Sequence, residues 1–220
     1  MSTVICVDGP AASGKSTVSK LIAQKIGYLY VDSGALYRIV TWLIKEDGCN
    51  MSSTEEIAEF AKNARVDFLP KENRVAYEVK GREPGDNIRS PEINALVSPV
   101  SAVPEVRALV TGWLRGMRSL GNLVVEGRDI GSVVFPDSVN RFYLDADPDV
   151  RARRRHKEDV AKGFADSASE GKVKESLLNR DKIDSTRKAA PLTIPEGAMV
   201  IDTTEMTIEQ VADTIIVNIK

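Results

Sequence analysis

The chain has 220 residues, 42% of them apolar, and a formal net charge of −2. This length is sufficient for one sizeable hydrophobic core, so one main domain is the default expectation. The near-neutral charge argues against a global field that would collect nucleic acid or anionic lipid, and any anion site must therefore be built locally. The two cysteines, Cys6 and Cys49, form no Cys-x-x-Cys pair, which argues against a disulfide framework or a zinc site.

The apolar run at the N-terminus is too short for a targeting segment. It extends from Val4 to Val7 and stops at Asp8, and no other stretch approaches the roughly 18 apolar residues of a membrane span. We therefore expect a soluble, cytoplasmic, unprocessed protein with reduced thiols. We also expect a monomer, with neither nucleic acid nor a membrane as partner.

The N-terminal part of the chain alternates between short apolar runs and segments with helical spacing of apolar residues. Val18, Leu21, Ile22 and Ile26 follow that spacing, and Gly27 is suited to cap the helix. Alternating strands and helices indicate a parallel sheet. The expected elements are a strand at 4–7, a helix at 16–26, a strand at 28–31 and helices at 35–45 and 53–64.

The middle of the chain departs from this alternation. Apolar and polar residues alternate over 66–79 around a turn at 70–73, which predicts a small antiparallel insert. The segment 91–120 is expected to be mainly helical, with breaks near Pro99 and Pro104.

The C-terminal part returns to the strand and helix alternation. Asp147 and Pro148 are a typical start of a helix, because aspartate caps the N-terminus and proline fits the first turn. The other expected elements are strands at 123–125, 142–144 and 199–201, and helices at 169–184 and 207–217.

The segment from Gly9 to Ser16 matches the pattern G-x-x-x-x-G-K-[ST] between a predicted strand and a predicted helix. Small residues let backbone N–H groups point at phosphate oxygens, and the helix dipole favours an anion. Lys15 is expected against the β- and γ-phosphates, and the Ser16 hydroxyl on Mg²⁺. An ordinary glycine turn is the alternative, but the flanking elements favour nucleotide binding. The residues expected to bind ATP are Gly9, Pro10, Ala11, Ala12, Ser13, Gly14, Lys15, Ser16 and Thr17.

The choice among phosphate-loop proteins depends on the rest of the sequence. A GTPase switch would be expected to carry Asn-Lys-x-Asp, which this sequence lacks. A kinase that phosphorylates a second phosphate needs arginines from several segments, because two polyanions must be brought together. Candidate arginines occur in four segments. The first, Arg38, follows the second predicted strand, where ligands of α/β sheets gather.

Three motifs in one order resemble bacterial-type cytidylate kinase: the phosphate loop, Asp32-Ser33-Gly34-Ala35-Leu36-Tyr37-Arg38, and Glu126-Gly127-Arg128-Asp129-Ile130-Gly131. The stretch from Val133 to Asp137, and Arg180-Asp181-x-x-Asp184-x-x-Arg187 leading to Ala190-Pro191-Leu192, resemble the same family. The resemblance spans essentially the whole chain. It implies transfer of the γ-phosphoryl group of ATP to CMP, and to dCMP, with Mg²⁺ accompanying ATP.

The resemblance also implies a fold and an acceptor site. The fold would be an α/β, three-layer P-loop NTPase fold with a parallel central sheet. A small antiparallel sheet would be inserted in the monophosphate-binding domain, and a short helical lid would cover ATP. Within a single kinase chain 1–220, the core would be 1–60, 120–150 and 188–220, the CMP-binding insert about 61–119, and the lid about 151–187. The residues implied to bind CMP are Ser33, Arg38, Ser98, Arg107, Arg128, Asp129, Arg180, Asp184 and Arg187.

The chemistry of cytosine is consistent with this assignment. Cytosine presents an N4 amino donor beside acceptors at N3 and O2, and Asp129, Ser98 and Arg107 supply complementary groups. Uracil would place O4 against Asp129, and such an unpaired buried contact costs about 1–3 kcal/mol. We therefore expect discrimination against UMP.

Spacing alone leaves several roles open. Arg180, Asp184 and Arg187 would share one face of a continuing helix, which is also how ordinary intrahelical ion pairs are arranged. Arg151, Arg154 and Arg155 would likewise share a face at the root of the lid, and a basic run is often only a solvated surface. We assign catalytic roles to Lys15, Arg128, Arg151 and Arg155.

Glu126 is placed at a strand end, where it could order the hydration shell of Mg²⁺ or act only as a local cap. A CMP phosphate oxygen is already anionic, so no general base is required. The single histidine, His156, is assigned no role.

The nearest rival function is that of a related kinase acting on UMP, AMP or an unphosphorylated metabolite. A nucleotide-binding regulator without turnover is the alternative from another class.

Overall fold

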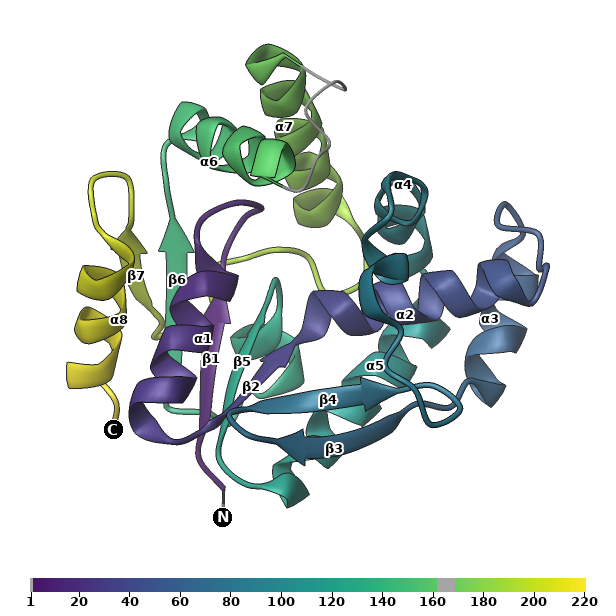
Figure 1. The fold of residues 1–220 in the computed structure, drawn as a ribbon, viewed down its shortest axis with the longest axis horizontal. Coiled ribbons are helices and arrows are strands. Elements are labelled where there is room, and N and C mark those ends of the chain that lie inside the picture. Colours follow the sequence, from purple (N-terminus) through teal and green to yellow (C-terminus); the bar gives the residue numbers. More distant parts are fainter. Residues whose placement is uncertain (1, 162–168) are drawn as a thin grey trace.

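The computed structural model describes residues 2–161 and 169–220, and within them a single seven-stranded sheet with the order β3-β4-β2-β5-β1-β6-β7 (Figure 1). Neighbouring strands are parallel except β3 and β4, which form an antiparallel hairpin. The strands are β1 Val4–Asp8, β2 Leu29–Asp32, β3 Asp67–Lys71, β4 Arg74–Glu78, β5 Leu123–Gly127, β6 Asn140–Asp145 and β7 Met199–Asp202.

Helices cover both faces of this sheet, and three short turns connect them to the strands (Figure 1). The helices are α1 Lys15–Ile26, α2 Ser33–Glu46, α3 Thr54–Asn63, α4 Pro91–Ser101, α5 Pro104–Gly116, α6 Pro148–Ala161, α7 Glu170–Thr186 and α8 Ile208–Val217. The turns are the 3₁₀ segments η1 Gly85–Arg89 and η2 Met117–Leu120, and the π-helical turn η3 Ile130–Val134.

The alternating direction of side chains along β1 divides the hydrophobic core into two layers. Ile5 and Val7 pack with the helices α1 and α8, whereas Val4 and Cys6 face the opposite cluster, to which α2, α4 and α5 contribute. A strand buried on both faces needs apolar residues at every position, which explains the unbroken run in the sequence. The α/β, three-layer arrangement predicted from the sequence is confirmed.

The local signals for helix ends correspond to observed caps. Gly27 has φ 71° and ends α1, and the Asp32 carboxylate accepts a hydrogen bond from the Ala35 N–H at the start of α2. Thr207 forms a capping box with Gln210 ahead of α8.

Three details differ from the sequence prediction. The β3-β4 hairpin is not a separate small sheet, because β4 pairs with β2 through Tyr30 and Arg74 and so extends the main sheet. Pro70 lies inside β3 rather than in the turn; β3 is an edge strand, where a missing N–H is tolerated. Pro99 lies inside α4, and the helices separate just before Pro104, since a residue preceding proline disfavours helical geometry.

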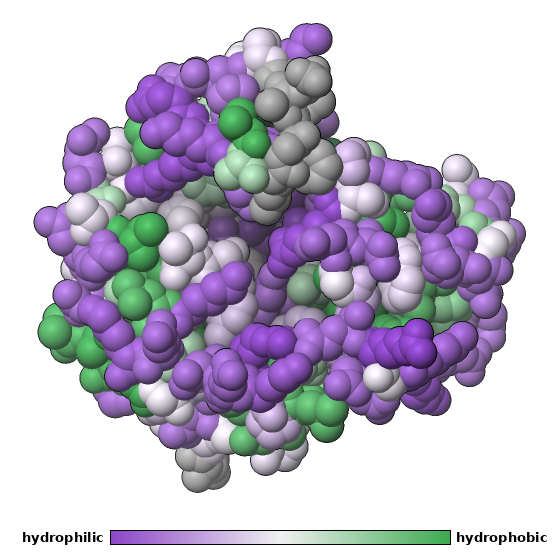
Figure 2. Space-filling model, viewed as in Figure 1, coloured by the Kyte–Doolittle hydropathy of each residue, from purple (hydrophilic) through white to green (hydrophobic). Residues whose placement is uncertain are grey.

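Helices α6 and α7 lie beyond the carboxyl ends of the central strands, above the loop that joins β1 to α1 (Figure 1). The surface is hollowed below this pair of helices, and the residues around the hollow are mostly hydrophilic (Figure 2). Within the described residues, no single helix is long and apolar enough to cross a membrane; only the bent pair Pro91–Ser101 and Pro104–Leu120, with 99° between its parts, passes on length and composition.

Candidate active site

The loop between β1 and α1 has a backbone shape that depends on glycine. Gly9 has φ 147°, and a Cβ there would lie 2.1 Å from the carbonyl oxygen of Leu144 on β6. Gly14 has φ 92° and precedes the first residue of α1. Ala12 is also left-handed, with φ 59°, which is uncommon for a residue with a Cβ. The loop thus lies tightly against β6 and ends at the N-terminus of a helix, as an anion cradle requires.

Lys15 at the start of α1 is buried and directed back into this loop. Its Nζ donates to the carbonyl oxygen of Pro10 at 2.5 Å and lies 3.4 Å from the Ser13 hydroxyl. Burial, followed by the nearby positive charge of Arg128, lowers the pKa of Lys15 to about 7. An anion in the loop would favour the charged form of this lysine.

A second group of polar side chains surrounds Glu126 at the carboxyl end of β5. The parallel register places Glu126 beside Asp32 of β2, and the Tyr30 hydroxyl donates to the Glu126 carboxylate at 2.5 Å. The Ser16 side chain lies near Glu126 and favours the charged form of its carboxyl group. Burial, followed by the charge of Asp32, raises the pKa of Glu126. The two residues expected near Mg²⁺, Ser16 and Glu126, therefore lie near each other, and both offer the oxygen ligands that this ion prefers.

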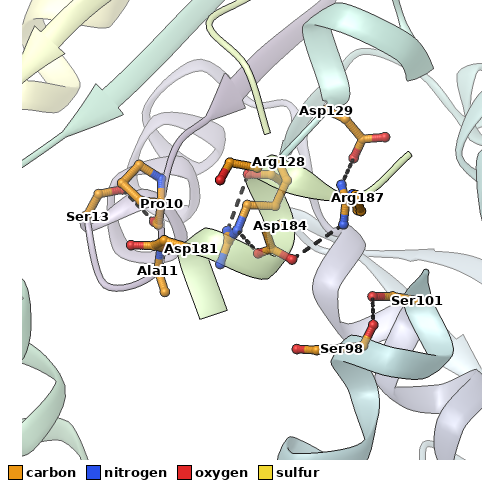
Figure 3. Close-up of polar contacts among 12 residues, drawn as sticks. Pro10, Ala11, Ser13, Ser98, Ser101, Arg128, Asp129, Asp181, Asp184 and Arg187 are labelled. Atoms are coloured by element: carbon orange, nitrogen blue, oxygen red, sulfur yellow. Dashed lines mark hydrogen bonds and ion pairs between the residues drawn. The ribbon is translucent and has the colours of Figure 1, made fainter. Parts of the chain in front are cut away.

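A chain of ion pairs links β5, α5 and α7 on the other side of the hollow (Figure 3). Arg128 Nε lies 3.0 Å from Asp184, and Arg187 lies 3.5 Å from Asp184 and 3.6 Å from Asp129. Arg107 completes the chain with a 2.5 Å contact to Asp129, where both side chains are about 95% buried. Arg187 follows the last residue of α7 in extended backbone, so the expected continuous helix through Arg187 is wrong although the cluster forms.

Three of the candidate arginines, Arg38, Arg128 and Arg180, lie close enough together for their positive charges to repel one another. The pKa of Arg180 is lowered to about 9 by burial and by the charges of Arg128 and Arg38, and its Nε is buried without a hydrogen-bond partner. Burial also lowers the pKa of Arg38, whose Nε donates to Asn94 of α4 at 3.2 Å. Such mutual repulsion in a buried site favours the binding of an anion.

The two serines that were expected to bind CMP, Ser33 and Ser98, make different hydrogen bonds. Ser33 donates its hydroxyl to the carbonyl oxygen of Glu126 at 2.6 Å, and so joins the start of α2 to the end of β5. Ser98 on α4 accepts through its carbonyl oxygen from Ser101. In Figure 3, Ser98 faces the open space bounded on its far side by Asp184 and Arg187.

The arginines of the expected lid point in different directions. Arg151 is buried and bonded to Ala146, Ala11 and Asp181, whereas Arg154 bonds to Thr203. Arg155 is about one-third exposed and pairs along its own helix. The charge of Arg155 also contributes, as the smallest of the causes, to the lowered pKa of Arg38 and of Arg180, so Arg155 lies within electrostatic range of both. Part of the expected lid, residues 162–168, lies outside the described residues.

Sequence reasoning missed several residues that organise the site. Asp8 is completely buried and accepts hydrogen bonds from the N–H groups of Ile130 and Gly131 at 2.8 and 2.7 Å. The sequence feature that could have indicated a structural role for Asp8 is its position between an apolar strand and a glycine loop. Arg89 in η1 pairs with Asp32 at 2.8 Å, and no local pattern indicates that contact.

Comparisons with known proteins agree with this geometry. The family model for cytidylate kinase matches residues 5–220. The cytidylate kinase of Limosilactobacillus reuteri (strain DSM 20016) is 41% identical over 211 residues, which cover 96% of this chain and 92% of that protein. The bifunctional pantoate ligase/cytidylate kinase of Synechococcus sp. (strain WH7803) is 42% identical over 217 residues, and the chain spans 97% of its own length but 44% of that relative.

A solved structure shows the same fold at low identity. The chain matches an uncharacterized protein from Eubacterium ventriosum ATCC 27560 with a TM-score of 0.55 and 12% identity, over 99% of this chain and 98% of the other. The family match, in contrast, covers nearly the whole sequence and includes the phosphate loop and the ion-paired residues Arg107, Asp129, Asp184 and Arg187. The chain belongs to the cytidylate kinase family.

Proposed function

We propose that the protein transfers the γ-phosphoryl group of ATP to CMP, and to dCMP, giving ADP and the corresponding diphosphate. One observation carries the choice of acceptor: the buried pair of Arg107 and Asp129 adjoins an arginine cluster that faces the phosphate loop. A guanidinium and a carboxylate held together can read the acceptor and donor edges of cytosine.

The acceptor phosphate is proposed to bind among the crowded arginines. Arg38, Arg128 and Arg180 supply positive charge from α2, the end of β5 and α7. The attacking oxygen of CMP is anionic at neutral pH, so the protein need only position it in line with the γ-phosphate and neutralise charge. The remaining members of the proposed CMP site are Ser33, Ser98, Asp184 and Arg187.

The phosphate loop, residues 9–17, is proposed to hold ATP, with Lys15 against the β- and γ-phosphates. We propose that Arg155 approaches the transferring group when α6 and α7 close over it. Arg151 donates to the Ala11 carbonyl oxygen of the loop and to Asp181 in this structure, so we propose that it supports the shape of the ATP site.

Ser16 and Glu126 fit a Mg²⁺ ion brought by ATP, because they offer a hydroxyl and a carboxylate that lie near each other. The ion would neutralise charge on the β- and γ-phosphates when bound.

The chain organisation proposed from the sequence follows the two sites. Residues 1–60, 120–150 and 188–220 form the core, about 61–119 the CMP-binding insert, and about 151–187 the lid. The η1 turn and α4 bring Arg89 and Asn94 toward Asp32 and Arg38, which supports the role given to the insert. The monomeric state and the cytoplasmic location stay predictions.

An acceptor panel tests the proposed function. ADP release is measured with CMP, dCMP, UMP, AMP and cytidine, and we expect CMP and dCMP to be preferred. Asp129→Asn keeps the shape of the side chain but replaces one acceptor oxygen by an amino donor; we expect the preference for CMP over UMP to fall about 10- to 100-fold. Glu105→Gln, at an exposed position on α5, is the matched control. An unchanged ratio in the Asp129 variant would contradict the proposed base recognition.

A further inference from the structure

Helix α7 carries residues that face two different sites. Arg180 and Asp184 belong to the proposed acceptor cluster, whereas Asp181 points to the phosphate loop (Figure 3). The acceptor cluster comprises Arg38, Arg107, Arg128, Asp129, Arg180, Asp184 and Arg187. Consecutive helical residues are about 100° apart, so one helix can present neighbouring side chains to both sites. Val173 and Leu177, earlier on α7, pack against Ala11 of the loop.

Asp181 closes a ring of hydrogen bonds with the phosphate loop. The Ala11 N–H donates to one Asp181 oxygen at 3.1 Å, and Arg151 Nη1 donates to the other at 2.5 Å. The same Arg151 nitrogen donates to the Ala11 carbonyl oxygen at 3.1 Å. The Arg151 side chain is 6% exposed and that of Asp181 16%, so the ring is largely shielded from water. Both peptide groups of Ala11 are therefore held by one carboxylate–guanidinium pair.

The backbone next to this ring needs such support. Ala12 has φ 59°, a conformation that costs a residue with a Cβ on the order of 1–3 kcal/mol and persists only where the surroundings enforce it. Arg151 is in turn fixed, because its Nε donates to the carbonyl oxygen of Ala146 at 3.1 Å. The ring thus connects the strained part of the loop to the end of β6 and to α7.

We propose that Asp181 is a positioning residue for ATP, which through Ala11 and Arg151 holds the phosphate loop in its binding shape and links it to the helix of the acceptor site. The inference rests on the proposed role of residues 9–17 as the ATP site. The proposal assigns to Asp181 its contacts with Ala11 and Arg151 and no contact with a substrate. Its effect passes through the loop backbone.

A role of charge alone makes the opposite prediction. A carboxylate beside a triphosphate site repels the ligand, but the charge of Asp181 also raises the pKa of Lys15, so binding is compared at about pH 6, where Lys15 is mostly charged. Under that condition removal of the carboxylate would strengthen ATP binding if position did not matter. Asp181→Asn removes the charge with little change of shape, and Asp181→Glu keeps the charge but displaces it by one methylene. If Asp181 positions the loop, both variants weaken binding.

The experiment measures the dissociation constant of a non-hydrolysable ATP analogue with Mg²⁺ by calorimetry, using the full chain, and then the steady-state KM for ATP and kcat. We expect about tenfold weaker binding and a similar rise in KM for both variants, since a hydrogen bond to a charged group is lost or misplaced, with kcat at saturating ATP close to that of the wild type. Glu175→Gln, an exposed change of the same charge on α7, should leave all three values unchanged.

Three results would overturn the inference. Tighter binding by Asp181→Asn would show that the carboxylate acts only through its charge, and equal binding would show that it does not influence the ATP site. Unchanged binding by Asp181→Glu would show that its position does not matter. Failure of the wild type to bind the analogue would instead refute the proposed ATP site itself, so the two failures are distinguishable.

Discussion

ATP binding should take up a proton above neutral pH, because the loop lysine is partly neutral before the nucleotide arrives. Burial and the charge of Arg128 lower the pKa of Lys15 to about 7. A bound triphosphate contributes the negative charge that favours the protonated amine and returns the pKa toward its ordinary value of about 10.4. Raising the pH therefore makes ATP binding weaker.

The size of the effect follows from that pKa. About one Lys15 in eleven carries its proton at pH 8, and about one in a hundred at pH 9, so affinity for ATP should fall about tenfold between these values. The same shift has a second consequence for the free protein. The unfolded chain binds more protons than the folded one between about pH 7 and pH 10, so this lysine makes stability rise with pH in that window.

Calorimetric titrations at pH 8 and pH 9, in buffers that differ in ionisation enthalpy, measure both affinity and proton uptake. We expect close to one proton taken up per ATP bound. Lys15→Arg provides the control, because a guanidinium stays charged in this range and its affinity should not vary with pH. Lys20→Ala, on the exposed side of α1, should titrate like the wild type. Equal wild-type affinities at the two pH values, without proton uptake, would refute this account of Lys15.

Three further predictions concern Gly9, Gly127 and Asp8, which lie around the sites. Gly9→Ala forces a Cβ against the Leu144 carbonyl oxygen at a φ of 147°, and should cost about 3 kcal/mol or more in urea unfolding; an unchanged midpoint would contradict the tight loop packing. Gly127→Ala would bring a Cβ to 2.6 Å from the Ser33 hydroxyl and 2.7 Å from Ile130, so we expect KM for CMP to rise more than KM for ATP, measured by initial rates. Burial raises the pKa of Asp8 to about 6, so the folded state binds more protons and stability falls as pH rises from about 4 to about 6. The stability difference between wild type and Asp8→Asn should change by about 2 kcal/mol over that range, and a constant difference would argue against a titrating Asp8.

The sequence was sufficient for the fold wherever the signal is local. A strand buried on both faces leaves no polar position, so the run from Val4 to Val7 could be recognised directly. Capping depends on neighbours within a few residues, and Thr207 with Gln210 shows how closely such a pattern specifies a helix start. Pairing of the β3-β4 hairpin with β2 has no local signal, because it depends on a single contact between Tyr30 and Arg74.

The site was predictable to the extent that motifs carry it. Family resemblance indicated Asp129, Arg107 and Asp184, and the structure brings them into one chain of ion pairs. The ion-pair partner of a buried charged residue could not be predicted in this way, because tertiary packing rather than sequence spacing determines it. Arg151 was assigned a catalytic role, which stays a prediction, and spacing did not indicate its observed partner Asp181, 30 positions further on.

The balance of charge in the acceptor cluster favours a phosphorylated acceptor over the free nucleoside. The arginines that meet there outnumber the carboxylates of Asp129 and Asp184, and the lowered pKa of Arg180 shows that the excess is felt inside the site. A monophosphate dianion would relieve this repulsion as it binds, whereas cytidine would leave it in place while still fitting the base-reading pair. Cytidine should therefore occupy the base position without filling the arginine cluster, and so be a far poorer ligand than CMP even though it carries the same base.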